Sequence, residues 1–504
     1  MENHSASDSE PDSHKKKKFN RIRVFYRLYR KRLIAGFVVL AHVAGALTSV
    51  EAVMETRTPP GAVAWAISLN LFPYGAVPAY WIFGHTEFES YQAASLLNEA
   101  EFEPIRQDLT SSLAKQGLRD IPDTPLEKML ESLTPLSFTY GNKVDLLVDG
   151  RETFDAMYAA IDSAQKYILL QSYIIRDDAT GRRFSEKLIA KAKAGVMVKV
   201  LYDEIGSLGL GSEFTGRLLA SGVDVKAFST NQSDGRKFQL NFRNHRKIMV
   251  VDGKIGFSGG LNIGDEYLGK HDELSPWRDT HMSVSGPTAM LLQLPFAEDW
   301  YWVTEEVLDG LDWELKPPAE DADATVLCLP TGPADIRETC GLFFLAAINS
   351  AKERLWIATP YFVPDEQILS ALKLAVLRGV DVRIIVPGMN DSTLVKFSSY
   401  AYLDEVKKAG VRAYRFGNGF LHQKTMLIDD DFSCVGSANM DNRSFRLNFE
   451  IVLAVKSEDF GNDMEKMFEK DFADSTEFNE KDLDEKSFPF RLSSRVSRLL
   501  APIQ

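Results

Sequence analysis

The chain has 504 residues, which is enough for two or three domains with cores of their own. Its three cysteines, Cys328, Cys340 and Cys434, are too few for a disulfide framework, and their spacing suits no metal site. The formal net charge is −13, and residues 1–32 carry ten Lys and Arg against four acids, so the rest of the chain carries −19. A body this acidic argues against a general nucleic-acid binder, whose affinity comes from basic surfaces.

Two apolar segments follow this basic arm. Residues 33–50 are apolar except for one histidine, one threonine and one serine, and residues 61–84 carry no charge. Because about 20 apolar residues cross the hydrocarbon layer, we expect a membrane hairpin over residues 33–86, with spans near 33–54 and 61–84. The basic residues before the first span place the N-terminus in the cytoplasm, and a second span would return the chain there.

Two alternatives stay open for these segments. The basic arm and the first apolar run could be a cleaved secretory signal, although the arm is long for one and a second apolar segment follows at once. Pro73 and Pro78 would also suit a re-entrant hairpin that enters the bilayer without crossing it. That hairpin leaves the same end of the chain in the cytoplasm.

The remaining chain reads as a connector and two similar halves. Residues 87–135 are polar and are expected to form a helical connector. In the halves, at residues 136–316 and 317–504, predicted helices alternate with predicted strands: helices 153–164, 183–194 and 216–221 with strands 167–175, 196–202 and 223–228, then helices 336–351, 366–378 and 402–409 with strands 355–362, 380–386 and 411–416. This alternation predicts an α/β fold with largely parallel sheets. Extra polar residues at 231–244 in the first half are expected to form a loop over a site.

A short motif occurs once in each half. Its two copies share one spacing, including a downstream glycine and asparagine: His245, Lys247, Asp252, Gly259 and Asn262 in the first copy, and His422, Lys424, Asp429, Gly436 and Asn439 in the second. A single His-x-Lys pair is usually a solvated strand edge. Here both copies run directly into apolar stretches typical of buried strands, and the repetition at equal spacing makes chance a poor explanation.

The repeated residues have the chemistry needed to hold a tetrahedral anion. Residues two apart on an extended segment point to one side, so each copy presents a proton-transfer group and a cation together. Two such faces brought together would grip a phosphate from both sides. Asp252 and Asp429 complete the motif as candidate catalytic residues, but at the far ends of their strands they are expected to anchor local backbone or polar groups.

Each half also has an acid at the start of a further strand, Asp279 in the first and Glu450 in the second. A catalytic imidazole needs an acceptor for its second nitrogen, which fixes its tautomer and ring direction. We therefore expect Asp279 to orient His245 and Glu450 to orient His422. A surface acid at a strand end is the alternative for each.

These motifs resemble the signature of the phospholipase D superfamily, and more narrowly the bacterial cardiolipin synthases within it. Further likeness lies in residues 57–61, which open the second apolar segment, and in residues 359–364 and 436–441. The resemblance extends from about Leu33 to the C-terminus. It implies two pseudo-twofold-related phospholipase D-like α/β/α halves and a multi-pass protein of the bacterial inner membrane, with its catalytic body in the cytoplasm.

The expected reaction is a double displacement at a phosphodiester. One histidine attacks phosphorus to give a phosphohistidine, and the other protonates the leaving alkoxide. The family pattern makes His245 the nucleophile and His422 the acid and base, an order that the internal symmetry alone leaves open. The groups expected to hold the non-bridging oxygens are Lys247, Lys424, Asn262 and Asn439.

Two phosphatidylglycerols would then give cardiolipin and glycerol, so the expected partners are membrane phospholipids and the bilayer. The two lysines supply the positive charge, and no metal or cofactor is expected. A phospholipase D or a phosphatidylserine synthase shares the same motifs and stays an alternative. A nuclease is disfavoured by the acidic body, and a non-catalytic scaffold by the two intact motifs. The oligomeric state stays open, a homodimer included.

Overall fold

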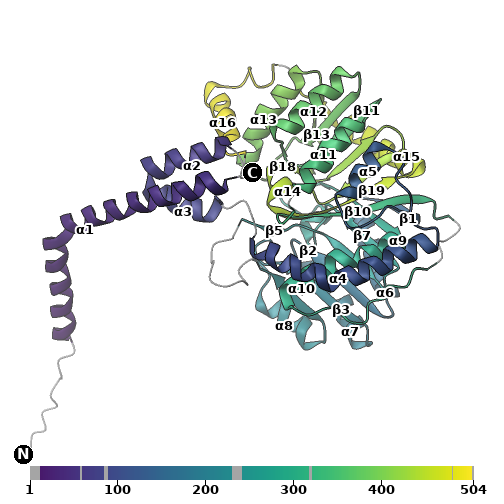
Figure 1. The fold of residues 1–504 in the computed structure, drawn as a ribbon, viewed down its shortest axis with the longest axis horizontal. Coiled ribbons are helices and arrows are strands. Elements are labelled where there is room, and N and C mark those ends of the chain that lie inside the picture. The colour runs from purple at the N-terminus through teal and green to yellow at the C-terminus, as the bar shows by residue number, and fades with distance from the viewer. Residues whose placement is uncertain are drawn as a thin grey trace, which may run out of the picture. The chain divides into compact units, whose positions relative to one another are not determined.

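The computed structural model describes residues 12–56, 59–84, 89–229, 241–316, 321–335, 337–479, 481–501 and 504 (Figure 1). The chain divides into two compact units, Met1–Thr86 and Glu87–Gln504. The predicted loop over the site lies mostly outside the described residues, because residues 230–240 are not among them.

In the N-terminal unit the described residues form three helices, α1 (Asp12–Glu55), α2 (Pro59–Leu71) and α3 (Pro73–Phe83). The stretch Tyr29–Glu55 of α1 is 27 residues long with a mean hydropathy of 2.1, so it is long and apolar enough to cross a membrane. It contains the first predicted span.

The second apolar segment is not the single continuous helix that the sequence predicted. Phe72 leaves the helical region, with φ −137° and ψ 59°, and α3 starts anew at Pro73, which has no N–H to continue the ladder of α2. At 1.5 Å per residue, α2 is about 20 Å long and α3 about 17 Å, each shorter than a hydrocarbon layer of about 30 Å. Both helices pack against α1.

A glycine allows α1 and α2 to approach closely. A Cβ atom at Gly45 of α1 would lie 2.2 Å from the carbonyl oxygen of Leu69 in α2, so any side chain there would push the helices apart. Around this contact Ala52, Leu69 and Tyr80 are fully buried. The three helices therefore form a packed unit.

The second unit begins with the predicted helical connector and continues into the first half of the body. The connector forms α4 (Glu89–Lys115) and α5 (Pro125–Ser132). The elements of the first half are β1 (Thr139–Val148), α6 (Asp149–Ser163), β2 (Tyr167–Ser172), α7 (Ala179–Lys193), β3 (Met197–Asp203), α8 (Ser212–Ala220), β4 (Asp224–Phe228), β5 (Arg243–Asn244), β6 (Ile248–Val251), β7 (Ile255–Gly259), the 3-10 helix η1 (Asp265–Leu268), β8 (Trp277–Arg278), β9 (Thr280–Ser285), α9 (Pro287–Leu291) and α10 (Gln293–Thr304).

The second half repeats this order and adds a C-terminal helix. Its elements are β10 (Ala324–Thr331), α11 (Thr339–Ser350), β11 (Arg354–Ala358), β12 (Phe362–Val363), α12 (Glu366–Leu377), β13 (Asp381–Pro387), α13 (Thr393–Lys408), β14 (Arg412–Phe416), β15 (Phe420–Leu421), β16 (Thr425–Ile428), β17 (Phe432–Gly436), β18 (Met440–Asp441), α14 (Asn442–Arg446), β19 (Asn448–Lys456), α15 (Glu458–Ala473), β20 (Ser475–Glu477) and α16 (Phe488–Arg498). The six predicted helices and six predicted strands of the two halves are confirmed, and their ends lie within about four residues of the predicted ones except in α13, which begins at Thr393, well before the predicted start at 402.

One mixed sheet runs through both halves in the order β20-β14-β13-β11-β16-β17-β19-β10-β1-β9-β7-β6-β2-β3-β4. From the central antiparallel pair β10–β1, the order outward is equivalent on the two sides, except that the second half adds the edge strand β20. The sequence reading missed both central strands, since it began each half at a helix.

The expectation of largely parallel sheets is wrong. Along the strand order of the main sheet, the parallel neighbours are β2, β3 and β4 and their counterparts β11, β13 and β14, which are the strands joined through helices. Three two-residue strands, β5, β12 and β15, also pair in parallel, with β19, β18 and β8. The pairings between β2, β6, β7, β9 and β1 are all antiparallel. The turn between β6 and β7 has three residues, too few for the crossover that a parallel neighbour requires.

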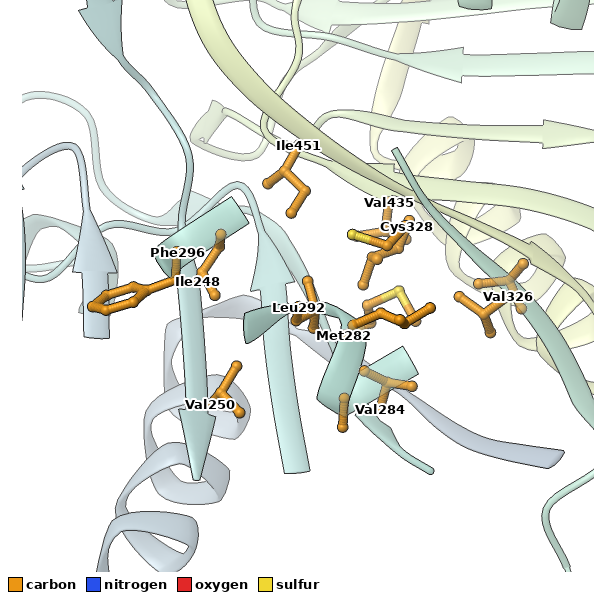
Figure 2. Close-up of a cluster of buried hydrophobic side chains, with 14 of the residues drawn as sticks. Ile248, Val250, Met282, Val284, Leu292, Phe296, Val326, Cys328, Val435 and Ile451 are labelled. Atoms are coloured by element: carbon orange, nitrogen blue, oxygen red, sulfur yellow. The ribbon is translucent and has the colours of Figure 1, made fainter. Parts of the chain in front are cut away.

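A hydrophobic cluster joins the two halves (Figure 2). It gathers buried side chains from strands on both sides of the central pair and from α9 and α10, among them Ile248, Val250, Met282, Val284, Leu292, Phe296, Val326, Cys328, Val435 and Ile451. Residues predicted to form the site adjoin this cluster in the chain. Ile248 directly follows the motif residue Lys247, and Ile451 directly follows the acid Glu450. Packing across the seam therefore positions residues of the two halves against each other.

We expect Leu292→Ala to lower the free energy of unfolding by about 2–5 kcal/mol, because it removes a fully buried side chain from this cluster. The matched control is Leu219→Ala on α8, where the side chain is 52% exposed and the cost should be within about 0.5 kcal/mol. Urea unfolding of the detergent-solubilised protein, followed by tryptophan fluorescence, measures both. Equal losses would mean that the cluster does not hold the halves together.

Candidate active site

The two motif histidines stand on short extended segments, and each segment runs beside a strand of the opposite half. β5 is parallel to the start of β19, and the backbone N–H of His245 donates to the carbonyl of Phe449 at 2.9 Å. β15 is parallel to β8, and the N–H of His422 donates to the carbonyl of Arg278 at 2.8 Å. These backbone pairings place each histidine next to an acid of the other half.

The predicted pairing of acids and histidines within each half is wrong. Nδ1 of His245 lies 2.8 Å from a carboxylate oxygen of Glu450, and Nδ1 of His422 lies 2.8 Å from one of Asp279. The register explains the exchange, because Asn244 pairs with Phe449 and Leu421 with Arg278, and the next residue along each segment is the histidine or the acid. Each half therefore orients the histidine of the other.

Both acids are fully buried and stay ionised. Burial alone would raise the pKa of Glu450, but His245, Lys247 and the hydroxyl of Ser437 lower it below its ordinary value. The pKa of Asp279 is lowered in the same way, against its burial, by His422 and Lys424. An ionised carboxylate at Nδ1 accepts the ring N–H, so Nε2 of each histidine is the nitrogen left for chemistry.

The two carboxylates differ in their other hydrogen bonds. Glu450 also accepts from the hydroxyl of Ser437, from Ser444 at 2.8 Å and from the amide of Asn448 at 3.1 Å. Asp279 accepts from the backbone N–H of Thr280 at 2.8 Å and, at 3.4 Å, from the indole of Trp277. Fewer donors compete with the imidazole for the charge of Asp279.

The motif lysines are buried beside their histidines. Nζ of Lys247 donates to the carbonyl of His245 at 2.7 Å, and Nζ of Lys424 lies 3.1 Å from Nε2 of His422. Burial lowers the pKa of Lys424 to about 8 and that of Lys247 well below its ordinary value. An anion bound between the two ammonium groups would raise the pKa of both lysines and stabilise their charged form.

The imidazoles are neutral in the ligand-free protein. Burial lowers the pKa of His245 to about 4, despite the opposing effect of Glu450, and lowers that of His422 as well. The ammonium group of Lys424 adds to the lowering at His245. Charges of the two halves thus act on each other, and the histidines and lysines of both motifs belong to one centre.

The two predicted phosphate-binding asparagines are held differently. The side chain of Asn262 accepts from the backbone N–H of Ile174 at 3.2 Å and donates to the hydroxyl of Tyr267 at 2.9 Å. The side-chain oxygen of Asn439 is buried and has no hydrogen-bond partner in the described part of the chain. Its carboxamide is therefore the freer of the two to meet a ligand.

The last residue of each motif has the structural role that the sequence predicted. The carboxylate of Asp252 accepts three backbone N–H groups of residues 165–167 at 2.8–2.9 Å, and Asp429 accepts those of residues 352–354 at 2.8–3.2 Å. Both residues have positive φ, 52° and 50°. Each fastens the turn after its motif strand to the start of a neighbouring strand.

The residue between the histidine and the lysine of each motif is also held by hydrogen bonds, and the sequence did not predict its partners. Arg246 donates to Asp299 of α10 at 2.9 Å and to the carbonyls of Glu450 and Thr331, each at 3.1 Å. Because side chains alternate along an extended segment, the sequence indicates that Arg246 points to the side opposite its two neighbours, but it does not identify the residues that Arg246 contacts.

In the second motif the position equivalent to Arg246 is occupied by an uncharged residue, Gln423. Gln423 accepts from the hydroxyl of Thr280 and donates to Asp471 of α15, both at 2.7 Å. Aromatic rings pack edge-on or tilted against the histidines, Tyr173 at 5.0 Å from His245 and Trp277 at 5.2 Å from His422. These contacts limit the movement of both imidazoles.

Among the residues that the structure describes, no group of three or more His, Cys, Asp or Glu side chains is placed to hold a metal ion. The described residues place the ammonium groups of the two motif lysines next to the histidines.

Comparison with known proteins assigns the class of the fold. The phosphatidylserine synthase of Haemophilus influenzae Rd KW20 superposes with a TM-score of 0.57 at 15% identity, covering 76% of this chain and 100% of that one. The family described as "Cardiolipin synthase, PLD-like domain" matches twice, at residues 157–283 and 344–472. The body is thus a duplicated phospholipase D-like fold.

Relatives narrow the assignment. The chain is 43% identical over 481 residues to cardiolipin synthase A of Pseudomonas putida (strain GB-1), covering 94% of this chain and 99% of that protein. It is 44% identical over 486 residues to cardiolipin synthase A of Pseudomonas aeruginosa (strain LESB58), covering 94% and 96%. The chain belongs to the cardiolipin synthase family of phospholipase D-like enzymes.

The lowered pKa of Lys424 predicts how activity depends on pH. The ammonium is charged below its pKa, so affinity for an anionic phosphodiester should be lost as the pH rises through about 8, and kcat/KM should fall there. The corresponding fall in kcat should lie at higher pH, because bound substrate stabilises the ammonium form of Lys424. Lys424→Arg keeps the positive charge, and kcat/KM of this variant should fall at a higher pH than that of the wild type. If kcat/KM of the variant fell at the same pH as that of the wild type, the titration would belong to a group other than Lys424.

Proposed function

We propose that the chain is a membrane cardiolipin synthase that transfers a phosphatidyl group from one phosphatidylglycerol to another and releases glycerol. One observation carries the proposal: each motif histidine is oriented by an acid of the opposite half, at a buried centre that both motif lysines share. Such a centre offers two imidazole nitrogens and two cations to one phosphodiester, which are the groups that a double displacement requires.

In the first displacement, Nε2 of His245 attacks phosphorus, an N–P bond forms and the bond to the glycerol oxygen breaks. His422 gives its Nε2 proton to that oxygen, so glycerol leaves neutral. In the second, His422 takes the proton of an incoming headgroup hydroxyl, whose oxygen displaces His245 from phosphorus. Both imidazoles then return to their starting state.

His422 must carry a proton before it can act as the acid, although its pKa is low in the empty site. An anionic phosphodiester close to the ring raises that pKa, so protonation accompanies binding. Asp279 accepts from fewer other donors than Glu450 does, which leaves more of its charge for the imidazolium of His422. This difference supports the order in which His245 is the nucleophile and His422 the acid and base.

The two halves are proposed to be related by a pseudo-twofold axis through the central β1–β10 pair. Support comes from the equivalent strand order on either side, the exchanged acid–histidine pairs and the two matches to one domain family. Such an axis would bring the two motifs to opposite sides of one substrate phosphate.

The N-terminal unit is proposed to lie in the bacterial inner membrane, with the N-terminus and the catalytic body in the cytoplasm. The apolar helix Tyr29–Glu55 follows a run of basic residues, which favour the cytoplasmic side. The helices α2 and α3 would return the chain to that side as a broken hairpin. A substrate lipid then reaches the centre from the same membrane, and its hydroxyl competes with water through its local concentration.

Product analysis tests the reaction. The purified full-length protein is incubated with phosphatidylglycerol vesicles, with and without serine, and the lipids are separated by thin-layer chromatography. Cardiolipin with an equal amount of free glycerol is expected in both samples. Phosphatidic acid as the main product would indicate hydrolysis, and phosphatidylserine in the serine sample would indicate a serine transferase.

His245→Ala and His422→Ala should each reduce cardiolipin formation below detection, because each removes a group that makes or breaks a bond to phosphorus or hydrogen. Asp279→Asn and Glu450→Gln should be slower by between about 10-fold and 10⁴-fold, the upper figure being the effect of the equivalent change in a serine-protease triad. Wild-type rates in Asp279→Asn and Glu450→Gln would contradict the proposal that these acids orient the histidines.

The order of the histidines is tested by trapping. Wild-type enzyme turning over phosphatidylglycerol radiolabelled at its phosphorus is quenched in base, where the N–P bond of a phosphohistidine survives. The label should map to the peptide that contains His245. Label on the His422 peptide would reverse the assignment, and unlabelled protein would exclude the covalent intermediate.

A further inference from the structure

The last helix of the body, α16, has an exposed apolar face. Residues 488–504 contain three arginines and no acid, in a chain whose net charge is −13. The large apolar residues at the helix and just after it are exposed by 43–77%: Phe488, Leu492, Val496, Leu499 and Leu500. Spacings of three and four residues put them on one side of the helix.

The opposite side of α16 is packed against α13 (Figure 1). The ring of Phe490 lies 5.0 Å from those of both Phe397 and Tyr400, and Ser494 and Ser497 are buried. These contacts fix the orientation of the helix. The exposed apolar face is therefore a stable surface of the body.

The arginines of α16 border this apolar face. Arg495 lies 3.3 Å from Asp404, and Arg498 lies 2.6 Å from Glu405 and 3.5 Å from Glu366, so the charge of these two arginines is balanced by acids of α12 and α13. Arg491 makes no ion pair with any residue that the structure describes, and its side chain is exposed. The free positive charge of the border is therefore that of Arg491.

An apolar stripe with a basic border is the pattern of a helix that lies in the plane of a membrane interface. Five exposed large apolar residues within 13 positions are costly in water and usually mark an interaction surface. A basic border favours an anionic bilayer surface over a neutral protein groove, since Arg491 can meet lipid phosphates.

We infer that α16 docks the catalytic body on the anionic lipid surface, with Phe488, Leu492, Val496 and Leu499 inserted among the lipids. The choice of an anionic lipid rests on the proposed function. Docking at this face would hold the body against the membrane that contains its substrate, independently of the N-terminal helices.

A lipid-quenching experiment tests the contact directly. The three native cysteines are buried, so a cysteine introduced by Val496→Cys can be labelled selectively with an environment-sensitive fluorophore. Leu219→Cys on α8 is the matched control, because the two side chains are 50% and 52% exposed. Each full-length protein is reconstituted in phosphatidylglycerol vesicles that contain nitroxide-labelled lipid.

The label at position 496 should be quenched at least about twice as strongly as the label at 219, and less strongly in phosphatidylcholine vesicles. Equal quenching at both positions would overturn the inference. A label at 496 that is shielded from water but not quenched by lipid would also overturn it, since a second copy or another part of the chain would then cover the face.

Activity gives a second readout. The double variant Leu492→Glu, Val496→Glu should raise the apparent KM for phosphatidylglycerol in vesicles about 10-fold, while kcat in detergent micelles stays within about 2-fold of wild type. Leu219→Glu should change neither value. Unchanged vesicle kinetics in the double variant would contradict docking. If wild-type enzyme made no cardiolipin, the proposed function would fail while the quenching result still decided the membrane contact.

Discussion

Two short parallel strand pairings, β5 with β19 and β15 with β8, determine the whole centre. Each lays a histidine segment of one half along the strand start of the other, so that the backbone register selects the carboxylate that meets each imidazole. The hydrophobic cluster across the β1–β10 seam holds these strands in place. Geometry at the phosphate therefore depends on packing between the halves as well as within them.

The electrostatics of the centre follow from this arrangement. Two buried lysines face two buried carboxylates, so the empty site is close to neutral when the imidazoles are uncharged. A phosphodiester adds one negative charge, which the lysines and a protonated His422 can balance. Binding and protonation are thus coupled, because a buried cation without a partner is costly.

Much of this could be predicted from the sequence, and the limits have physical causes. The duplicated spacing identified both motifs and the two anchoring aspartates, because such spacing directly reflects strand geometry. The partners of His245 and His422 were assigned to the wrong halves, since proximity along the chain says nothing about which strands pair across a seam. The central strands β1 and β10 were missed, and Asp299 and Asp471 could not be found because each braces its motif from a helix distant in sequence.

The exchange of acids between halves changes how genetic data on this enzyme should be interpreted. A lesion at Asp279 disables the histidine 143 positions downstream, and a lesion at Glu450 disables one 205 positions upstream. Suppressors would then arise in the half opposite to the original mutation. Two proteins, each carrying one defective half, could complement each other only if whole halves were exchanged between copies.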